Sequence, residues 1–282
     1  MRIIDYDLLS IQEARILVEN AHEAQKIMAT FPQEKLDEIV ECMAASIAPY
    51  TKELAVMSSD ETDYGKWQDK YIKNRFACEF VLEKLRGMRC VGIIAKDESK
   101  KIMDIGVPMG VIISLCPSTS PVSTSIYTAL VAVKSGNAVV FSPHPRAKNV
   151  IAKTLDIMIQ AAEYCGLPEG ALSYLSTVTA AGTKELMNHK STSLIINTGV
   201  SGMLEAAYSS GKPVIYGGNG NGPAFIERTA NISQAVRDII ASKTFDNGVV
   251  AAAEQSIVVD SCIANRVREE MEKCGGYFMS EE

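Results

Sequence analysis

The sequence predicts an α/β fold, with a parallel β-sheet covered by helices and an N-terminal helical region in front of it. Residues 8 to 88 carry apolar side chains at helical spacing, and from Gly110 onward the pattern changes to alternating strands and helices. The run GVIISLCP at 110–117 is apolar throughout, as expected of a strand that is buried on both faces. Repeated β–α units of this length favour right-handed crossovers and therefore a parallel sheet.

The N-terminal region is expected to begin with two helices and to contain a third, longer one. The sequence SIQE at 10–13 resembles a capping box at the start of the first helix. The pair Phe31-Pro32 ends this helix and begins the second. The third helix is expected from about Trp67 to Leu85, just before a glycine that closes it.

A hairpin and then the sheet follow. Two short strand signals, Cys90–Ile94 and Lys101–Ile105, flank the charged linker KDES and predict a β-hairpin. STSIYTALVAVKSG and NAVVFSP are then typical of a helix and a strand, and the next helix begins near Pro145 and ends before Gly166. ALSYLST, TKELMNH, SLIINTG, SGMLEAAYSSG and KPVIYGG continue the alternation.

Composition and charge exclude several classes of protein. The 282 residues allow about two domains, and 47% hydrophobic with 22% charged residues is the balance of an ordinary globular chain. A formal net charge of -6, without a block of Lys or Arg, argues against a nucleic-acid partner. No apolar run reaches the length of a membrane span and no signal-peptide core follows Met1, so no membrane partner is expected.

The cysteines and histidines indicate a reducing compartment and no metal site. Seven cysteines are scattered, odd in number and never spaced as CxxC, which favours reduced thiols in a cytoplasm over disulfides or a zinc site. With only three histidines in the chain, metal chemistry is not expected.

Ligands of parallel α/β sheets bind beyond the carboxyl ends of the strands, so the loops at these ends are candidate binding sites. Three of them are polar and contain Gly or Pro: CPSTSP at 116–121, SPHPRAK at 142–148 and NTGVSG at 197–202. One such turn is more often a plain strand-to-helix connection, but three on one edge, one of them with glycines before a helix N-terminus, favour a nucleotide cofactor. For His144 in the second of these loops, the alternative is a solvent-exposed position without a binding role. The candidate cofactor-binding residues are Pro117, Ser118, Ser142, Pro143, His144, Thr198, Gly199 and Gly202.

A second candidate site lies near the C-terminus, in FDNGVVAAAEQSIVVD at 245–260. Asp246, Asn247 and Gly248 tolerate the left-handed backbone of a tight turn, and SIVV at 256–259 is a β-branched run typical of a buried strand. A turn that presents backbone to a pocket usually carries a reactive side chain, whereas this one is followed by three alanines. The residues leave two interpretations open, an active-site loop without its nucleophile and a plain turn before a strand.

Four segments closely resemble the CoA-acylating aldehyde dehydrogenases, including the aldehyde half of bifunctional aldehyde–alcohol dehydrogenases. They are KNRFACEFV, VKSGNAVVFSPHPRAKNV, AAYSSGKP and SKTFDNGVVAAAEQSIVVD, and the match covers nearly the whole chain in order. The resemblance implies a Rossmann-like domain that holds NAD, here residues 1–243 with the N-terminal helices, and the start of a second α/β catalytic domain at 244–282. It also implies that a cysteine thiolate attacks a small aldehyde, that hydride passes to the nicotinamide, and that coenzyme A takes the acyl group from the thioester. The choice between NAD and NADP and the length of the aldehyde stay open.

The sequence departs from this family pattern at two site positions. The family places its cysteine as FDNG-x-x-Cys, and here that position is Ala251, whose methyl group cannot attack a carbonyl. The family also uses an Asn to hold the developing oxyanion, and here Ser120 stands at that position. Misplacing one such donor typically costs on the order of 10²–10³ in rate. Cys116 is the alternative thiol, although a cysteine in such a place is more often a small buried hydrophobe.

Compared with the family, the chain also ends early, and only the strand SIVVD and one further helix of the catalytic domain are expected. A single strand cannot satisfy its own backbone, so we expect either a fragment or a partner, in a homo-oligomer or with another chain. Two functional hypotheses follow, both for a cytoplasmic protein. The first is an NAD- and CoA-dependent aldehyde dehydrogenase altered at its nucleophile, and the second is a non-catalytic nucleotide-binding or assembly subunit derived from one. Whether the alanine and the early end are natural or engineered stays open.

Overall fold

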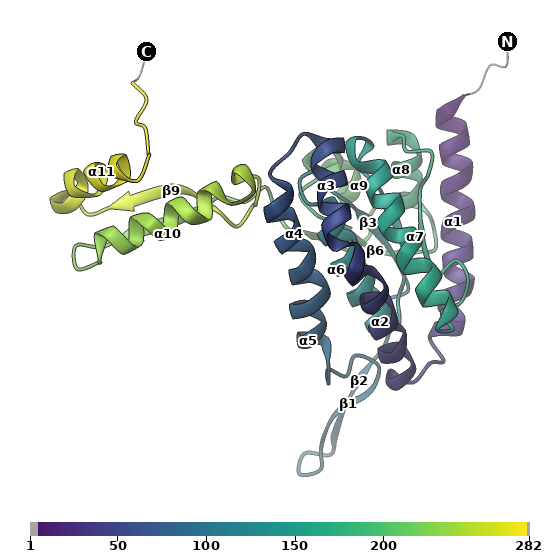
Figure 1. The fold of residues 1–282 in the computed structure, drawn as a ribbon. Coiled ribbons are helices and arrows are strands. Elements are labelled where there is room, and N and C mark those ends of the chain that lie inside the picture. The colour runs from purple at the N-terminus through teal and green to yellow at the C-terminus, as the bar shows by residue number, and fades with distance from the viewer. Residues whose placement is uncertain (1–4, 281–282) are drawn as a thin grey trace.

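The computed structural model describes residues 5–280, which form a larger and a smaller unit (Figure 1). The larger unit is built on a five-stranded sheet with the strand order β5-β4-β3-β6-β7, and every pair in it is parallel. The predicted α/β class, with a parallel sheet and N-terminal helices, is therefore confirmed. Its strands are β3 (Val111–Leu115), β4 (Ala138–Ser142), β5 (Leu172–Tyr174), β6 (Thr192–Asn197) and β7 (Val214–Tyr216).

Helices cover both faces of this sheet. Every residue of β3 and β4 is buried although successive side chains point to opposite faces, so neither face of these strands is open to solvent. One helix, α1, packs against α8 and the strands β3 to β5. On the other face, α6 packs against β4 and α7 against β5, and α2 packs against both of these helices. The helices are α1 (Tyr6–Met28), α2 (Gln33–Ile47), α6 (Pro121–Lys134), α7 (Lys148–Tyr164), α8 (Ala180–Asn188) and α9 (Leu204–Ser209).

The N-terminal region contains a helix that the sequence did not reveal, α3 (Thr51–Thr62). The helix expected from Trp67 to Leu85 is confirmed as a continuous helical segment. It consists of α4 (Trp67–Arg75), a π-helical turn at Phe76–Val81 and α5 (Leu82–Leu85). The break at Phe31-Pro32 is also confirmed, because it lies between the end of α1 and the start of α2.

The predicted capping box at 10–13 is wrong, because α1 already begins at Tyr6. Asp5 is the N-cap, and its Oδ1 accepts hydrogen bonds from the N–H groups two and three residues later, at 3.0 and 3.1 Å. Ser10 lies inside the helix, is fully buried, and donates a hydrogen bond to the Thr177 carbonyl. The serine that resembled a cap therefore joins α1 to the segment after β5.

The predicted hairpin is confirmed as β1 (Gly92–Asp97) and β2 (Ile102–Gly106), an antiparallel pair that projects from the larger unit (Figure 1). Its apolar side chains are between 45% and 61% exposed: Ile93, Ile94, Ile102, Met103 and Ile105. Several exposed apolar side chains on one short hairpin are typical of a contact with another molecule.

The smaller unit has a core of its own. β8 (Gly222–Ile226) and β9 (Glu254–Val259) form a parallel pair, and α10 (Ile232–Thr244) packs against both strands and against α11 (Ala264–Lys273). The expectation that the strand at 256–260 stands alone is therefore wrong. Its partner, GPAFI, contains a glycine and a proline, which conceal a strand in the sequence. The core side chains are Ile226, Ile232, Val236, Ile239, Ile263 and Val267.

The division expected between residues 243 and 244 stays a prediction. β8 and all of α10 except Thr244 precede it in the chain, yet they share the second core with β9 and α11. The smaller unit therefore draws on residues that the sequence had assigned to the cofactor domain.

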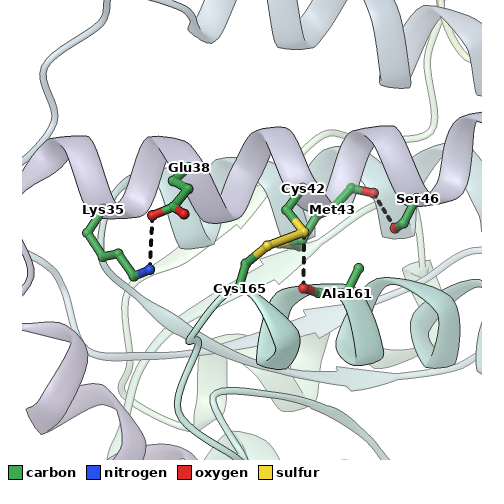
Figure 2. The surroundings of a disulfide bond; sticks show 7 residues. All are labelled: Lys35, Glu38, Cys42, Met43, Ser46, Ala161 and Cys165. Atoms are coloured by element: carbon green, nitrogen blue, oxygen red, sulfur yellow. Dashed lines mark hydrogen bonds and ion pairs between the residues drawn. A yellow bond between two sulfur atoms is a disulfide. The ribbon is translucent and has the colours of Figure 1, made fainter.

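Cys42 on α2 and Cys165, directly after α7, form a disulfide (Figure 2). The expectation of reduced thiols throughout is therefore wrong for this pair. The two cysteines are 123 residues apart and meet only because α2 and α7 pack side by side, which no local pattern reveals. The Cys42 sulfur also lies 3.2 Å from the Ala161 carbonyl oxygen, a contact that becomes a hydrogen bond when the sulfur carries a proton.

Candidate functional site

The carboxyl ends of β4, β3 and β6 lie side by side, because these strands are neighbours in the sheet. Leu115, the last residue of β3, is level with Ser142 of β4 and with Asn197 of β6. The three polar loops that follow these strands therefore share one edge of the sheet, as predicted.

A cavity of about 240 Å³ lies between these loops, and four predicted cofactor residues line it: Ser142, Pro143, His144 and Gly202. Most of its walls are apolar, and the hydroxyls of Ser142 and Thr183 hydrogen bond to each other at 2.8 Å. An apolar slot with few polar groups at this edge suits a planar ring such as a nucleobase. The other lining residues are Leu115, Cys116, Pro145, Val178, Thr179, Ala180, Thr183, Val200 and Met203.

His144 is half-buried against this cavity, so the alternative of a fully exposed loop position is not observed. Its Nδ1 accepts a hydrogen bond from the Arg146 N–H at 3.1 Å. Burial, followed by the charge of the Arg146 guanidinium, lowers the pKa of the imidazole. The ring is therefore neutral near pH 7, and Nε2 is its remaining polar atom for a ligand.

The other predicted cofactor residues lie outside this cavity. Pro117 is buried and Ser118 half-buried in the connection from β3 to α6, and Gly199 is exposed with a left-handed backbone, φ 72°. Asn197, which sequence reasoning missed, holds the glycine turn in shape. Its Oδ1 accepts the Val200 N–H at 2.8 Å and its Nδ2 donates to the Val200 carbonyl at 3.0 Å. An Asn at the end of a buried strand, directly before Thr-Gly, is the signal that could have revealed it.

The turn at 245–248 packs against the start of α4. Asp246 and Asn247 both adopt the left-handed backbone, with φ of 49° and 54°, as the sequence predicts. The Asp246 N–H donates to the Asp69 carboxylate at 2.8 Å. Gly65 leaves room for this approach, because a Cβ there would lie 1.9 Å from Asp246 Oδ1. The segment around Gly65 and Asp69 and the turn at 245–248, far apart in the sequence, are thus in direct contact.

The Asp246 carboxylate is the centre of a buried ionic cluster. Asp246 is completely buried, and its Oδ1 accepts the Lys66 N–H at 2.8 Å. Its Oδ2 accepts hydrogen bonds from the ammonium groups of Lys70, at 3.4 Å, and Lys73. Burial, and then the charge of Lys73, lowers the pKa of Lys70 to about 8, against the opposing pull of Asp246. A carboxylate persists in such a place only when its charge and lone pairs are compensated, as they are here.

The same two lysines hold the loop before α6. Lys70 Nζ donates to the Thr119 carbonyl at 2.8 Å. Lys73 Nζ donates to the same carbonyl at 3.3 Å and to Ser120 Oγ at 2.7 Å. Ser120, the predicted oxyanion residue, is the N-cap of α6, but its side chain makes no capping hydrogen bond. The cluster therefore brings Ser120 and the turn at 245–248 together. Sequence reasoning missed both lysines, because Lys at i and i+3 on a helix is ordinarily a solvated face.

Ala251 is exposed in the loop between this turn and β9. Its carbonyl packs against Gly220, where a Cβ would lie 2.1 Å from the Ala251 oxygen. The alternative thiol, Cys116, is buried, which raises its pKa to about 11, and its Sγ lies 3.7 Å from Ser125 Oγ. Little of such a thiol is ionised near pH 7, which argues against Cys116 as a substitute nucleophile.

A second cavity, of about 450 Å³, lies beside the ionic cluster. Lys73 and Phe245 both line it, and so does Thr198, which the sequence had assigned to the cofactor. An apolar pocket with a few hydroxyls at its edge suits an aliphatic chain that carries a polar oxygen. The other lining residues are Ile72, Phe76, Ala77, Val81, Ser123, Thr124, Tyr127, Thr128 and Ile196.

Within residues 5–280, no three His, Cys, Asp or Glu side chains gather as a metal site would require. None of the helices in that range is both long and apolar enough for a membrane crossing.

The parallel sheet, the cavity at its carboxyl edge and the tight turn beside a second cavity define an α/β protein of the dehydrogenase type. The chain belongs to the aldehyde dehydrogenase family, which it matches over residues 2–274. It is 40% identical over 270 residues to the bifunctional aldehyde-alcohol dehydrogenase AdhE of Escherichia coli, a match that covers 96% of this chain and 30% of the relative.

Solved structures of acylating enzymes share the fold. An acetylating aldehyde dehydrogenase from Geobacillus thermoglucosidasius is 45% identical, with a TM-score of 0.93, over 99% of this chain and 62% of the other. A propionaldehyde dehydrogenase from Rhodopseudomonas palustris, with bound CoA and an acylated cysteine, is 28% identical, with a TM-score of 0.81, over 95% and 61%. The chain thus spans less than two thirds of each of these relatives.

Proposed function

We propose that this chain binds a nicotinamide nucleotide and a small aldehyde but does not by itself carry out the CoA-dependent oxidation typical of its acylating relatives. One observation carries the proposal. The cluster that holds the turn at 245–248 is complete, whereas Ala251, three residues after that turn, carries only a methyl group. The acylated cysteine of the Rhodopseudomonas palustris structure supports a cysteine as the acyl carrier in the family.

The residues of the 240 Å³ cavity fit the nucleoside part of NAD, which when bound supplies a hydride acceptor. Apolar walls from Pro143, Val200 and Met203 suit an adenine ring at the carboxyl edge of the sheet. Space remains beside Gly202, since no heavy atom lies within 4 Å of a Cβ built there. We assign NAD to this cavity, with NADP as the alternative.

The 450 Å³ cavity beside Lys73 and Phe245 is the proposed aldehyde site. It lies next to Ser120, which the resemblance assigns to the oxyanion, and next to the turn that leads to residue 251. A cysteine introduced at position 251 would restore part of the CoA-dependent aldehyde oxidation. Coenzyme A is the proposed co-substrate of that reaction.

A second candidate function is assembly, as a non-catalytic subunit in a homo-oligomer or with another chain of the cytoplasm. The exposed apolar side chains of the β1–β2 hairpin favour it, because a contact with another chain would remove them from water. Sedimentation of the wild type beside Ile105→Lys tests this role, and an unchanged sedimentation coefficient would speak against it.

Nucleotide binding and turnover are tested separately. Calorimetric titration with NADH should show binding that Gly202→Val weakens roughly tenfold or more, a loss of about 1.4 kcal/mol. Gly217→Val is the matched control, because open space also surrounds Gly217 and its backbone is not left-handed. Equal titrations of the wild type and Gly202→Val would contradict the assignment of the cavity.

Turnover is measured as NADH formation from propionaldehyde, CoA and NAD. The wild type should be inactive, and Ala251→Cys should gain measurable activity. Turnover by the wild type that survives Cys116→Ser would overturn the proposal, since it would require a nucleophile other than those considered.

A further inference from the structure

We propose that Lys73 is a positioning residue that fixes the Ser120 hydroxyl as a hydrogen-bond donor to the carbonyl group of a ligand in the 450 Å³ cavity. The inference rests on the proposed aldehyde site and adds to it a residue with a defined task.

The direction of the hydrogen bond between Lys73 and Ser120 follows from chemistry. An ammonium group has three protons to donate and no lone pair with which to accept. Lys73 Nζ has three acceptors: the Thr119 carbonyl, Ser120 Oγ and Asp246 Oδ2. All three protons are therefore engaged, and the Ser120 oxygen is an acceptor. The Ser120 proton is left over, and no described residue accepts it.

The ammonium of Lys73 is itself held in place. Its counterion Asp246 is completely buried, and the Lys66 N–H and Lys70 Nζ fix that carboxylate from two other directions. Only 15% of the Lys73 side chain is exposed, so water competes little for its protons. A serine hydroxyl rotates freely unless its oxygen is engaged, and this charge-assisted bond limits the rotation.

Ser120 does not itself line the cavity, but it is hydrogen bonded to a residue that does and directly precedes a helical turn that does. Lys73 lines that cavity, and so do Ser123 and Thr124 in the first turn of α6, which Ser120 caps. The Thr124 N–H donates to the Ser120 carbonyl at 3.1 Å, which ties the serine to that turn. A ligand carbonyl in the cavity is therefore the acceptor that the arrangement leaves open. The Lys73 ammonium thus fixes the direction of the Ser120 O–H. An Asn side chain, which the family resemblance places at this position, would have a fixed N–H direction from its planar amide.

The experiment uses the protein as it is, with Ala251, and carbonyl-labelled butyramide as a stable probe. Binding is measured by calorimetry, and the carbonyl stretch of the bound probe by infrared spectroscopy. Lys73→Met and Ser120→Ala should each weaken binding about fivefold, the effect of one neutral hydrogen bond, and shift the stretch to higher frequency. Lys73→Met made in the Ser120→Ala protein should have no further effect, because the donor that it orients is already gone.

Two controls separate positioning from a general loss of structure. Lys73→Arg keeps a charged donor and should retain more of the wild-type affinity and frequency than Lys73→Met does. Lys66→Met removes an exposed lysine that meets Asp246 only through its backbone, and it should change neither. Independent, additive effects of Lys73→Met and Ser120→Ala, or an unchanged frequency in Lys73→Met, would overturn the role of Lys73 while leaving the aldehyde site intact. Absence of butyramide binding in the wild type would instead remove the proposed aldehyde site, and the role of Lys73 with it.

Discussion

Replacing Lys70 by Met should change how the stability of the protein depends on pH. The Lys70 side chain is only 2% exposed, and burial, with the charge of Lys73 second, lowers its pKa from 10.5 to about 8. Asp246 opposes this shift without cancelling it. The ammonium of Lys70 is therefore less favourable in the folded protein than in the unfolded chain.

The sign and the size follow from this difference in pKa. Between pH 8 and 10.5 the unfolded chain binds more protons at Lys70 than the folded protein does, so stability rises with pH. Below pH 8 both states are protonated and the folded state bears the full cost. Above pH 10.5 both are neutral and the cost has vanished. A difference of 10.5 − 8 pKa units corresponds to about 3 kcal/mol.

Urea unfolding at a series of pH values from about 7.5 to 10.5 measures the effect as the free energy of the wild type minus that of Lys70→Met. Groups outside the cluster titrate alike in the two proteins, so their contributions cancel in this difference. It should rise by about 3 kcal/mol across the range. Lys66→Met, which removes an exposed lysine, is the control and should give a flat difference. A flat difference for Lys70→Met as well would refute the burial of a destabilised ammonium in this cluster.

Two further predictions concern the larger unit. Reducing the Cys42–Cys165 disulfide should lower the free energy of unfolding by up to about 5 kcal/mol, because the bond closes a loop of 123 residues. Equal denaturant midpoints of the wild type and Cys165→Ser under oxidising conditions would contradict it, with Cys90→Ser as the control. Gly182→Ala should cost about 1–3 kcal/mol, since its Cβ would lie 1.8 Å from Ser10 Oγ, whereas Gly217→Ala, in open space, should change stability by less than about 0.5 kcal/mol. Equal effects of the two substitutions in urea unfolding would refute the close packing of α1 on α8.

The parts of the fold that the sequence predicts are those with a strong local pattern. The apolar run of β3 and the Pro and Gly that bound α7 indicate their elements without any long-range information. Ser10 shows the limit of such signals. Its spacing to Glu13 fits a capping box, but both side chains instead bond the segment after β5, at Thr177 and its neighbour Ser176. The pairing of β8 with β9 is non-local in the same way, because 27 residues lie between Ile226 and Glu254.

In the candidate site, too, the features with a local sequence signal could be predicted and the long-range contacts could not. The common edge of the three loops follows from the parallel sheet, and the left-handed turn follows from Asp246 and Asn247. The partners of Asp246 could not be predicted, since they lie more than 170 residues earlier on α4. The disulfide could not be predicted for the same physical reason. Its two cysteines are 123 residues apart, and only the packing of α2 against α7 brings them together.

The contacts of the turn at 245–248 are independent of the side chain at position 251, the proposed nucleophile position. Two consecutive left-handed residues that are not glycine cost about 1–3 kcal/mol each, and buried charges add to that cost. Both costs are offset by bonds from Asp246 to Asp69, Lys70 and Lys73, and the side chain at position 251 makes none of these bonds. A cysteine or an alanine there is therefore equivalent for the fold. The architecture of the turn therefore supports the proposed binding site, and under our proposal the chemistry of residue 251 decides whether that site can turn over.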